Sequence, residues 1–97
     1  MFAGTLVADF LLGDVHSLKE KRGVVRPIVA ELRRRYAVSA AEVGKVDLHG
    51  RTEIGVAIIG TDAGHVTAVL DACERLLAAR PEVELVDVRR RLFGEED

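Results

Sequence analysis

The sequence predicts an α+β fold in which six elements follow one another in the order β-α-β-β-α-β. Four segments have the apolar pattern of strands, at residues 2–12, 38–43, 51–60 and 83–92. Two segments between them have apolar residues at helical spacing, at residues 17–36 and 61–80. This order is typical of the split βαβ, or ferredoxin-like, fold and predicts a four-stranded antiparallel sheet with two helices on one face. The 97 residues are expected to form one such domain, with residues 93–97 as a frayed tail.

The first strand, Phe2–Leu12, is expected to have two unequal faces. Its larger apolar side chains alternate onto one face, which carries Phe2, Leu6, Phe10 and Leu12. The other face carries Thr5, Val7 and Asp9. The first face is therefore expected to meet the helices.

The first helix is expected to begin at a capping box formed by Ser17 and Glu20, after a turn at residues 13–16. Its apolar residues recur at helical spacing through Tyr36. Pro27 lies inside this segment, where a proline removes one hydrogen bond and clashes with the preceding turn. The sequence therefore predicts either a kink near Gly23 or a short first helix followed by a second that starts near Val24.

The second half of the chain repeats this alternation of strands and a helix. A short, Ala-rich strand is predicted at residues 38–43, followed by a loop at 44–50 and a strand at 51–60 with inward Ile54, Val56 and Ile58. Thr61 or Asp62 is expected to cap the second helix, and Arg80-Pro81 to end it. The last strand is predicted at 83–92.

Composition places the chain among ordinary globular proteins, with 48% hydrophobic and 31% charged residues. Its one cysteine, Cys73, cannot form an internal disulfide and lies in the apolar stripe of the second helix, so we expect a reducing, cytoplasmic location and a structural role for this thiol. The apolar N-terminal stretch is interrupted by Asp9 and lacks the features of a secretion signal. No segment approaches the ~20 apolar residues of a membrane span.

Charge is distributed unevenly, although the net charge is only −2. Residues 1–36 hold seven Lys and Arg against four Asp and Glu, whereas residues 37–97 hold seven against twelve. At 100° per residue, four cations of the first helix fall within an arc of roughly 60°. They are Lys19, Arg22, Arg26 and Arg33. This basic stripe could contact the phosphates of RNA or of a ribosomal particle; the alternative is a solvated flank whose methylene groups cover the edge of the core.

Lys21 differs from these cations because it points into the apolar arc near the start of the helix. Such a lysine must extend outward or meet an acidic partner. Asp14 and Glu20 are near it in sequence. We expect Lys21 to form a structural ion pair rather than a binding site.

The sheet face opposite the helices is expected to carry exposed apolar residues. They include Thr5, Val7, Leu11, Ala57 and Ile59. Exposed apolar patches usually mark interfaces, so this face predicts a homo-oligomer. The alternative is an ordinary solvated face of an antiparallel sheet.

No catalytic or cofactor motif in the sequence is strong, and metal binding is not expected. The three histidines, His16, His49 and His65, have no metal-ligand spacing. The Gly13–Arg22 loop superficially resembles the anion cradle of small acylphosphatases, but the chain lacks the Asn those enzymes use. Base stacking on the sheet, as in RRM domains, is not expected because the third strand has no aromatic residue. A small-ligand or phosphate-ester enzyme at the Gly13–Ser17 turn is a third, weaker hypothesis.

Several segments together resemble a known family of small bacterial proteins. They are HSLKEKR at 16–22, RPIVAELRRRY at 26–36, VSAAEV at 38–43 and VELVDVRRRL at 83–92. The chain resembles the YlxP-like family over nearly its whole length, and SLKEKR is the most specific part. Family members typically show AEVDHQDLWQRA between the middle strands, where this chain has AEVGKVDLHGRT at 41–52. His49 therefore replaces the usual Trp, which could alter an interface or a partner contact.

The resemblance implies a ferredoxin-like fold and no demonstrated enzyme activity. Family members are often encoded beside translation and ribosome-maturation factors, which implies an RNA-linked role. We therefore expect a non-enzymatic binding protein without a cofactor, associated with RNA or a ribosomal particle through its basic first helix. The alternative hypothesis is a structural or regulatory homo-oligomer that assembles through the open sheet face and has no nucleic-acid role.

Overall fold

The computed structural model describes residues 1–94 and contains four strands and two helices in the predicted order. They are β1 (Phe2–Leu11), α1 (Leu18–Tyr36), β2 (Ser39–Gly44), β3 (Arg51–Gly60), α2 (Ala63–Ala78) and β4 (Glu84–Phe93). The strands form one antiparallel sheet in the order β2-β3-β1-β4. The predicted ferredoxin-like arrangement is confirmed.

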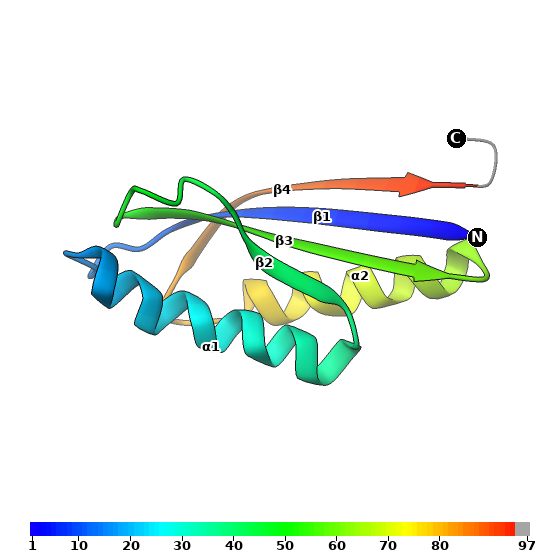
Figure 1. Ribbon diagram of the computed structural model, residues 1–97, viewed down its shortest axis with the longest axis horizontal. Helices are drawn as coiled ribbons and strands as arrows, with labels where there is room; N and C mark the ends of the chain where they lie inside the picture. Colours follow the sequence, from blue (N-terminus) through cyan, green and yellow to red (C-terminus); the bar gives the residue numbers. More distant parts are fainter. Residues whose placement is uncertain (95–97) are drawn as a thin grey trace.

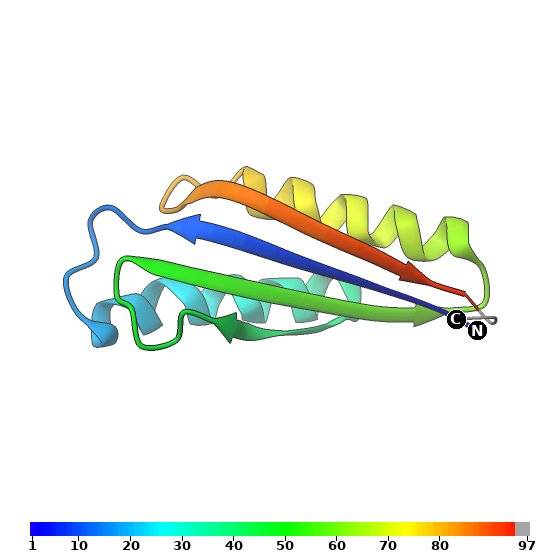
Figure 2. The same cartoon turned by 90° about the horizontal axis from the view of Figure 1, so that it is seen from above.

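Both helices lie on one face of the sheet, and the other face is open (Figures 1 and 2). Helix α2 packs mainly against the central strands β1 and β3, whereas α1 lies against β2. Gly4 in β1 permits this close approach, because a Cβ atom there would lie 2.6 Å from Val66 and 2.7 Å from Leu70. The described chain is elongated, with extents of 44 × 23 × 18 Å.

The core fills the space between the sheet and the helices. Its largest fully buried apolar side chains come from every element except β2 and β4, and include Leu6, Phe10, Ile28, Leu32, Ile54, Val66 and Leu77. Ile54 and Val56 point inward as predicted, and Ile58 packs partly buried against the same core. Burial of this apolar surface is the main force that holds the helices to the sheet.

Helix α1 begins as predicted and continues past Pro27. The Ser17 hydroxyl accepts a hydrogen bond from the Glu20 backbone N–H at 3.1 Å, and the Glu20 carboxylate accepts one from the His16 N–H at 3.0 Å. Of the two predicted alternatives, the short first helix followed by a second from Val24 is wrong, because the helix is continuous from Leu18 to Tyr36 with Pro27 inside it (Figure 1). Val25 and Ile28, on either side of the proline, are buried in the core, and this packing offsets the lost hydrogen bond and the clash with the preceding turn.

Element ends differ from the predictions by one or two residues. Strand β2 begins at Ser39 rather than Val38, and α2 ends at Ala78, before Arg80-Pro81. The cap of α2 is Asp62, one of the two predicted residues. Phe93, expected in the frayed tail, is the last residue of β4 and pairs with Ala3. Gly94, also in that expected tail, follows the strand, and residues 95–97 lie outside the described residues.

Candidate functional site

Lys21 is the most buried charged side chain in the structure, with 2% of its surface exposed. Its ammonium group donates to three carbonyl oxygens of the β2–β3 loop: 2.7 Å to that of Lys45, 3.3 Å to Val46 and 2.6 Å to Leu48. A fourth acceptor, the Glu42 carboxylate, lies 2.7 Å away. The expectation of a structural ion pair is therefore correct, but the partner is Glu42 and neither of the carboxylates near Lys21 in sequence, Asp14 and Glu20. The ammonium turns inward to the sheet, whereas the Glu20 carboxylate is bound to the His16 N–H.

Glu42 extends this polar cluster into the sheet. Its carboxylate accepts a hydrogen bond of 2.6 Å from the hydroxyl of Thr52, which is fully buried. A buried cation needs both a counter-charge and further hydrogen bonds, and Lys21 has both. We call Lys21, Glu42, Thr52 and the loop carbonyls that Lys21 binds the lysine clamp. The clamp joins the SLKEKR segment to the AEVGKVDLHGRT segment, which are far apart in sequence.

The predicted basic stripe lies along α1 as expected, and part of it borders a groove. Arg22, Arg26 and Arg33 line a hollow of about 510 Å³ between α1 and β2, whose apolar wall includes Val25 and Val29. Lys19 is exposed one turn before Arg22 and is not among the lining residues. The structure therefore brings three of the four predicted residues together on one groove.

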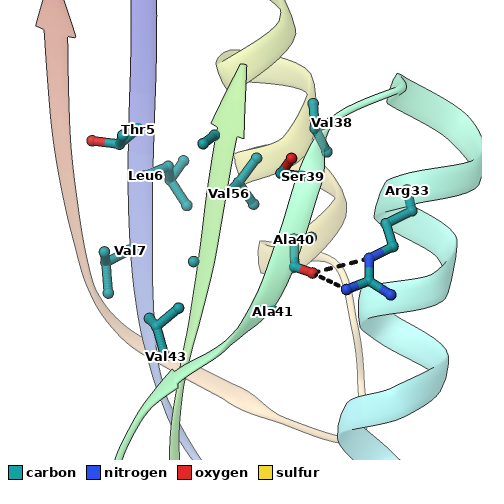
Figure 3. Close-up of a pocket in the computed structure, with 12 residues that line it drawn as sticks. Thr5, Leu6, Val7, Arg33, Val38, Ser39, Ala40, Ala41, Val43 and Val56 are labelled. Atoms are coloured by element: carbon teal, nitrogen blue, oxygen red, sulfur yellow. Dashed lines mark hydrogen bonds between the residues drawn. The ribbon is translucent and has the colours of Figure 1, made fainter. Parts of the chain in front are cut away.

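Arg33 differs from the other members of the stripe because it already has a partner. Its guanidinium group donates two hydrogen bonds to the backbone oxygen of Ala40, at 3.0 and 2.6 Å (Figure 3). This oxygen belongs to the edge strand β2, where unpaired backbone groups invite pairing with another chain. Arg33 thus protects a sheet edge and has fewer donors free for a ligand.

Cations without a carboxylate partner concentrate on α1. Seven of the fourteen Lys and Arg side chains form ion pairs within residues 1–94. The seven others in this part of the chain are Lys19, Arg22, Arg26, Arg33, Arg34, Arg75 and Arg91, and the first five are on α1. The structure thus places an uncompensated positive surface on one helix of a protein with a net charge of −2.

The open sheet face carries all five residues predicted for an interface. Thr5 pairs with Ala57 on neighbouring strands, while Ile59 is 66% exposed farther along β3. Small side chains leave a hollow of about 610 Å³ over β1, β3 and β2 (Figure 3). Its lining on this face includes Thr5, Val7, Ser39, Ala41, Val43 and Ala57. Leu11 lies beyond Asp9 at the far end of β1, apart from this hollow.

The same face also carries an ionic cluster that the sequence did not indicate. Asp9 binds Lys45 at 2.5 Å and Arg51 at 2.9 Å, although these residues are 36 and 42 positions away. The hydrogen bond from Lys45 is the main reason that the pKa of Asp9 is lowered from 3.8; burial opposes this, and Arg51 adds to it. Beside it, Arg89 binds Glu53 at 2.6 Å and Asp87 at 3.2 Å. These groups compensate one another and leave little net charge for a ligand.

Other candidate groups have structural surroundings. Cys73 is fully buried, and burial raises the pKa of its thiol, which lowers its reactivity. The Ser17 hydroxyl and Glu20 carboxylate at the Gly13–Ser17 turn are used in helix capping. Residues 1–94 hold no group of three or more His, Cys, Asp or Glu side chains placed to bind a metal ion. Neither helix in this part of the chain is long and apolar enough to cross a bilayer.

Comparison with known proteins gives consistent results. Residues 3–90 match the model of a family described as "Protein of unknown function (DUF503)". The chain is 28% identical over 90 residues to "Uncharacterized protein YlxP" of Bacillus subtilis (strain 168), covering 93% of this chain and 98% of that protein. A de novo designed protein with a ferredoxin fold, LFR1, known from its solution NMR structure, aligns with a TM-score of 0.52 and 10% identity, over 98% of this chain and 87% of its own. That likeness concerns the fold alone.

Proposed function

This chain belongs to the DUF503 family of proteins of unknown function, and we propose that it is a non-enzymatic binding protein whose helix α1 contacts the phosphate backbone of RNA. The proposed contacts are Lys19, Arg22 and Arg26, with Arg33 at the end of the stripe. Neither the fold nor the family indicates a catalytic activity. A cytoplasmic location fits this proposal.

The observation that carries the proposal is the absence of ion pairs for these cations within residues 1–94. Lys19, Arg22 and Arg26 are exposed, and in that range they have no carboxylate partner. The stripe from Lys19 to Arg33 spans about 21 Å of helix at 1.5 Å per residue. Guanidinium groups bind phosphate oxygens through two parallel hydrogen bonds, and a row of them binds a polyanion without reading its sequence. The stripe therefore suits a nucleic-acid backbone.

The open sheet face lacks the features by which the sheet of an RRM domain binds RNA. The residues that β1 and β3 present on this face include no aromatic side chain on which a base could stack. Three cations of this face, Lys45, Arg51 and Arg89, are held by carboxylates of the same face. Arg91 of β4, which pairs with Thr5, has no carboxylate partner within residues 1–94 but lies 4.6 Å from the centre of the Phe93 ring. An RNA contact is therefore expected at α1, where several free cations lie in a row, rather than on the sheet.

The test is a filter-binding titration of a structured RNA hairpin at several salt concentrations. We expect wild-type protein to retain the RNA and a Lys19→Glu, Arg22→Glu, Arg26→Glu variant to lose retention. The matched control is Arg34→Glu, Arg75→Glu, Arg91→Glu, which changes net charge by the same amount with residues outside the proposed stripe. Equal retention by wild type and the stripe variant would contradict the proposal, as would equal loss in both variants.

A second candidate function is self-association through the open sheet face. The observation that favours it is the apolar hollow on this face, together with the exposure of Ile59 and Val43, which are 66% and 55% exposed. It is tested by light scattering of the wild type and of Val7→Asp and Ile59→Asp variants. A dimer or larger species that both substitutions dissociate would support it, and a wild-type monomer would rule it out.

A further inference from the structure

The lysine clamp has a consequence for the surface above it. The carbonyl oxygens of Lys45, Val46 and Leu48 all point inward to the Lys21 ammonium. Val46 and Leu48, which supply two of these carbonyls, have side chains that are 55% and 52% exposed, although both are large and aliphatic.

Leu18 adds a third exposed aliphatic side chain to this end of the molecule. It is the first residue of α1 and is 40% exposed, although a capped helix could place a polar residue there. The start of α1 and the β2–β3 loop lie at the same end of the molecule in both views (Figures 1 and 2). We call Leu18, Val46 and Leu48 the loop-end patch.

A small hollow lies within this patch. It has a volume of about 170 Å³ and is lined by Leu18, Lys21, Arg22, Glu42, Val46 and Asp47. This volume is below the roughly 300–1,000 Å³ of small-molecule sites, so it suits one anchoring side chain rather than a free ligand. Buried anchors in such pockets carry much of the affinity of protein–protein interfaces.

The charges around the hollow indicate what should accompany the anchor. Arg22 lines it and has no carboxylate partner within residues 1–94. Asp47 also lines the hollow and has no cationic partner in the same range. However, Lys19 and Arg26, on either side of Arg22 along α1, have no carboxylate partner there either, so positive charge is in excess around Arg22. Lys21 and Glu42, which form its inner wall, already satisfy each other. A segment that binds here therefore gains most from an acidic residue placed toward Arg22.

The clamp also makes this surface rigid before any partner arrives. Four acceptors surround one buried ammonium, and Lys45 is held with a φ of 54°, a left-handed conformation that is uncommon outside glycine. A pre-ordered surface loses less conformational entropy when it binds. The chain thus uses a buried charge to fix a loop whose exposed side chains are apolar.

From this arrangement we propose that the loop-end patch docks a protein segment that carries a large apolar side chain with an acidic residue next to it. The apolar side chain enters the hollow between Leu18 and Val46, and a carboxylate pairs with Arg22. This site is separate from the proposed RNA contact, except that Arg22 borders both.

The test is a selection of random 12-residue peptides displayed on phage against the full chain, with counter-selection against a Val46→Asp variant. We expect enrichment of peptides with Leu, Ile, Phe or Trp next to Asp or Glu. Fluorescence anisotropy of a labelled, synthesised winner then gives its Kd. Val46→Asp and Arg22→Glu should each weaken binding by about tenfold or more, the loss typical of an anchor residue. Leu48→Asp serves as a second patch variant if Val46→Asp does not fold.

The matched control is Val86→Asp, which changes a similarly exposed valine on β4, and it should leave the Kd within about twofold, as expected for a distant surface position. No enrichment, enrichment of basic peptides, or winners insensitive to Val46→Asp and Leu48→Asp would overturn the proposal. A wild-type dimer that Val46→Asp dissociates would also overturn it, because the patch would then be occupied by a second copy. We expect the Val46→Asp variant to retain RNA at the wild-type level, so that a failure of this docking proposal can be distinguished from a failure of the proposed RNA contact.

Discussion

Lys21 and Arg22 are neighbours in the chain but lie in opposite environments. The Lys21 ammonium is 2% exposed and meets four acceptors, including the carboxylate of Glu42. The Arg22 guanidinium is exposed and has no carboxylate partner within residues 1–94. Within one turn of helix, the ammonium group of Lys21 is therefore hydrogen-bonded inside the protein, whereas the guanidinium group of Arg22 is available to bind a ligand.

The difference teaches how to read a run of basic residues. The sequence KEKR suggests one basic cluster, but helix geometry sends its members to different sides. The buried cation contributes to stability, and its loss should be measured by unfolding. The exposed cations should contribute little to stability and should be measured by binding. The predictions below test this division.

The largest effect is expected for Lys21→Met. This substitution leaves the Glu42 carboxylate without its cation and three loop carbonyls without their donor, so it should lower the free energy of unfolding by about 3 kcal/mol. Chemical denaturation measures this value. Lys19→Met is the matched control and should change it by less than about 0.5 kcal/mol. Similar values for the two variants would contradict the division.

Glu42→Gln should destabilise the protein less, by about 1–2 kcal/mol, because the amide can still accept hydrogen bonds from Lys21 and Thr52. In the Lys21→Met background, Glu42→Gln should lower the free energy of unfolding much less, since the carboxylate that it removes is then unpaired. A double-mutant cycle should give a coupling energy above about 1 kcal/mol. Additive effects of the two substitutions would mean that the pair does not act as a unit.

Within the basic stripe, Arg33 and Arg26 should behave differently. Arg33→Met removes two hydrogen bonds to the Ala40 oxygen and should cost about 1 kcal/mol of stability. Arg26→Met removes no hydrogen bond within residues 1–94 and should change stability by less than about 0.5 kcal/mol. Thermal unfolding of both variants checks this difference. Equal destabilisation would show that the stripe cannot be divided in this way.

The smallest effect is expected for Asp9, whose ion pairs lie on the open sheet face. Because its folded pKa is lowered, its charged form adds stability that is fully present above the unfolded value near 3.8. This contribution disappears as the pH falls through the lower folded pKa. The stability difference between wild type and Asp9→Asn should therefore be constant near neutral pH and shrink below about pH 4. Denaturation at neutral and acid pH tests this, and a pH-independent difference would contradict it.

The sequence predicted the fold well because its signals are local. The cap at Ser17 and Glu20 depends on residues three positions apart, and the strand faces depend on simple alternation. The sequence left open whether α1 continues through Pro27, because core packing on both sides of the proline, which outweighs its local penalty, is not a local signal.

The site could be predicted only in part, because its contacts depend on the tertiary structure. Helical spacing revealed that Lys21 faces inward, but its partner Glu42 is 21 residues away, and no local rule selects it over Glu20. The Arg33 contact with Ala40 likewise depends on how α1 lies beside β2. The open-face residues were found by alternation, whereas the ionic cluster around Asp9 joins three distant segments.

The most direct test of the division is the salt dependence of RNA binding. We expect the slope of log K against log salt concentration to fall by about 2–3 in a Lys19→Gln, Arg22→Gln, Arg26→Gln variant, close to one unit for each phosphate that the variant no longer neutralises. Its free energy of unfolding should remain that of the wild type. The control variant Arg34→Gln, Arg75→Gln, Arg91→Gln should keep the wild-type slope. An unchanged slope in the stripe variant, or wild-type protein that binds no RNA, would contradict the account.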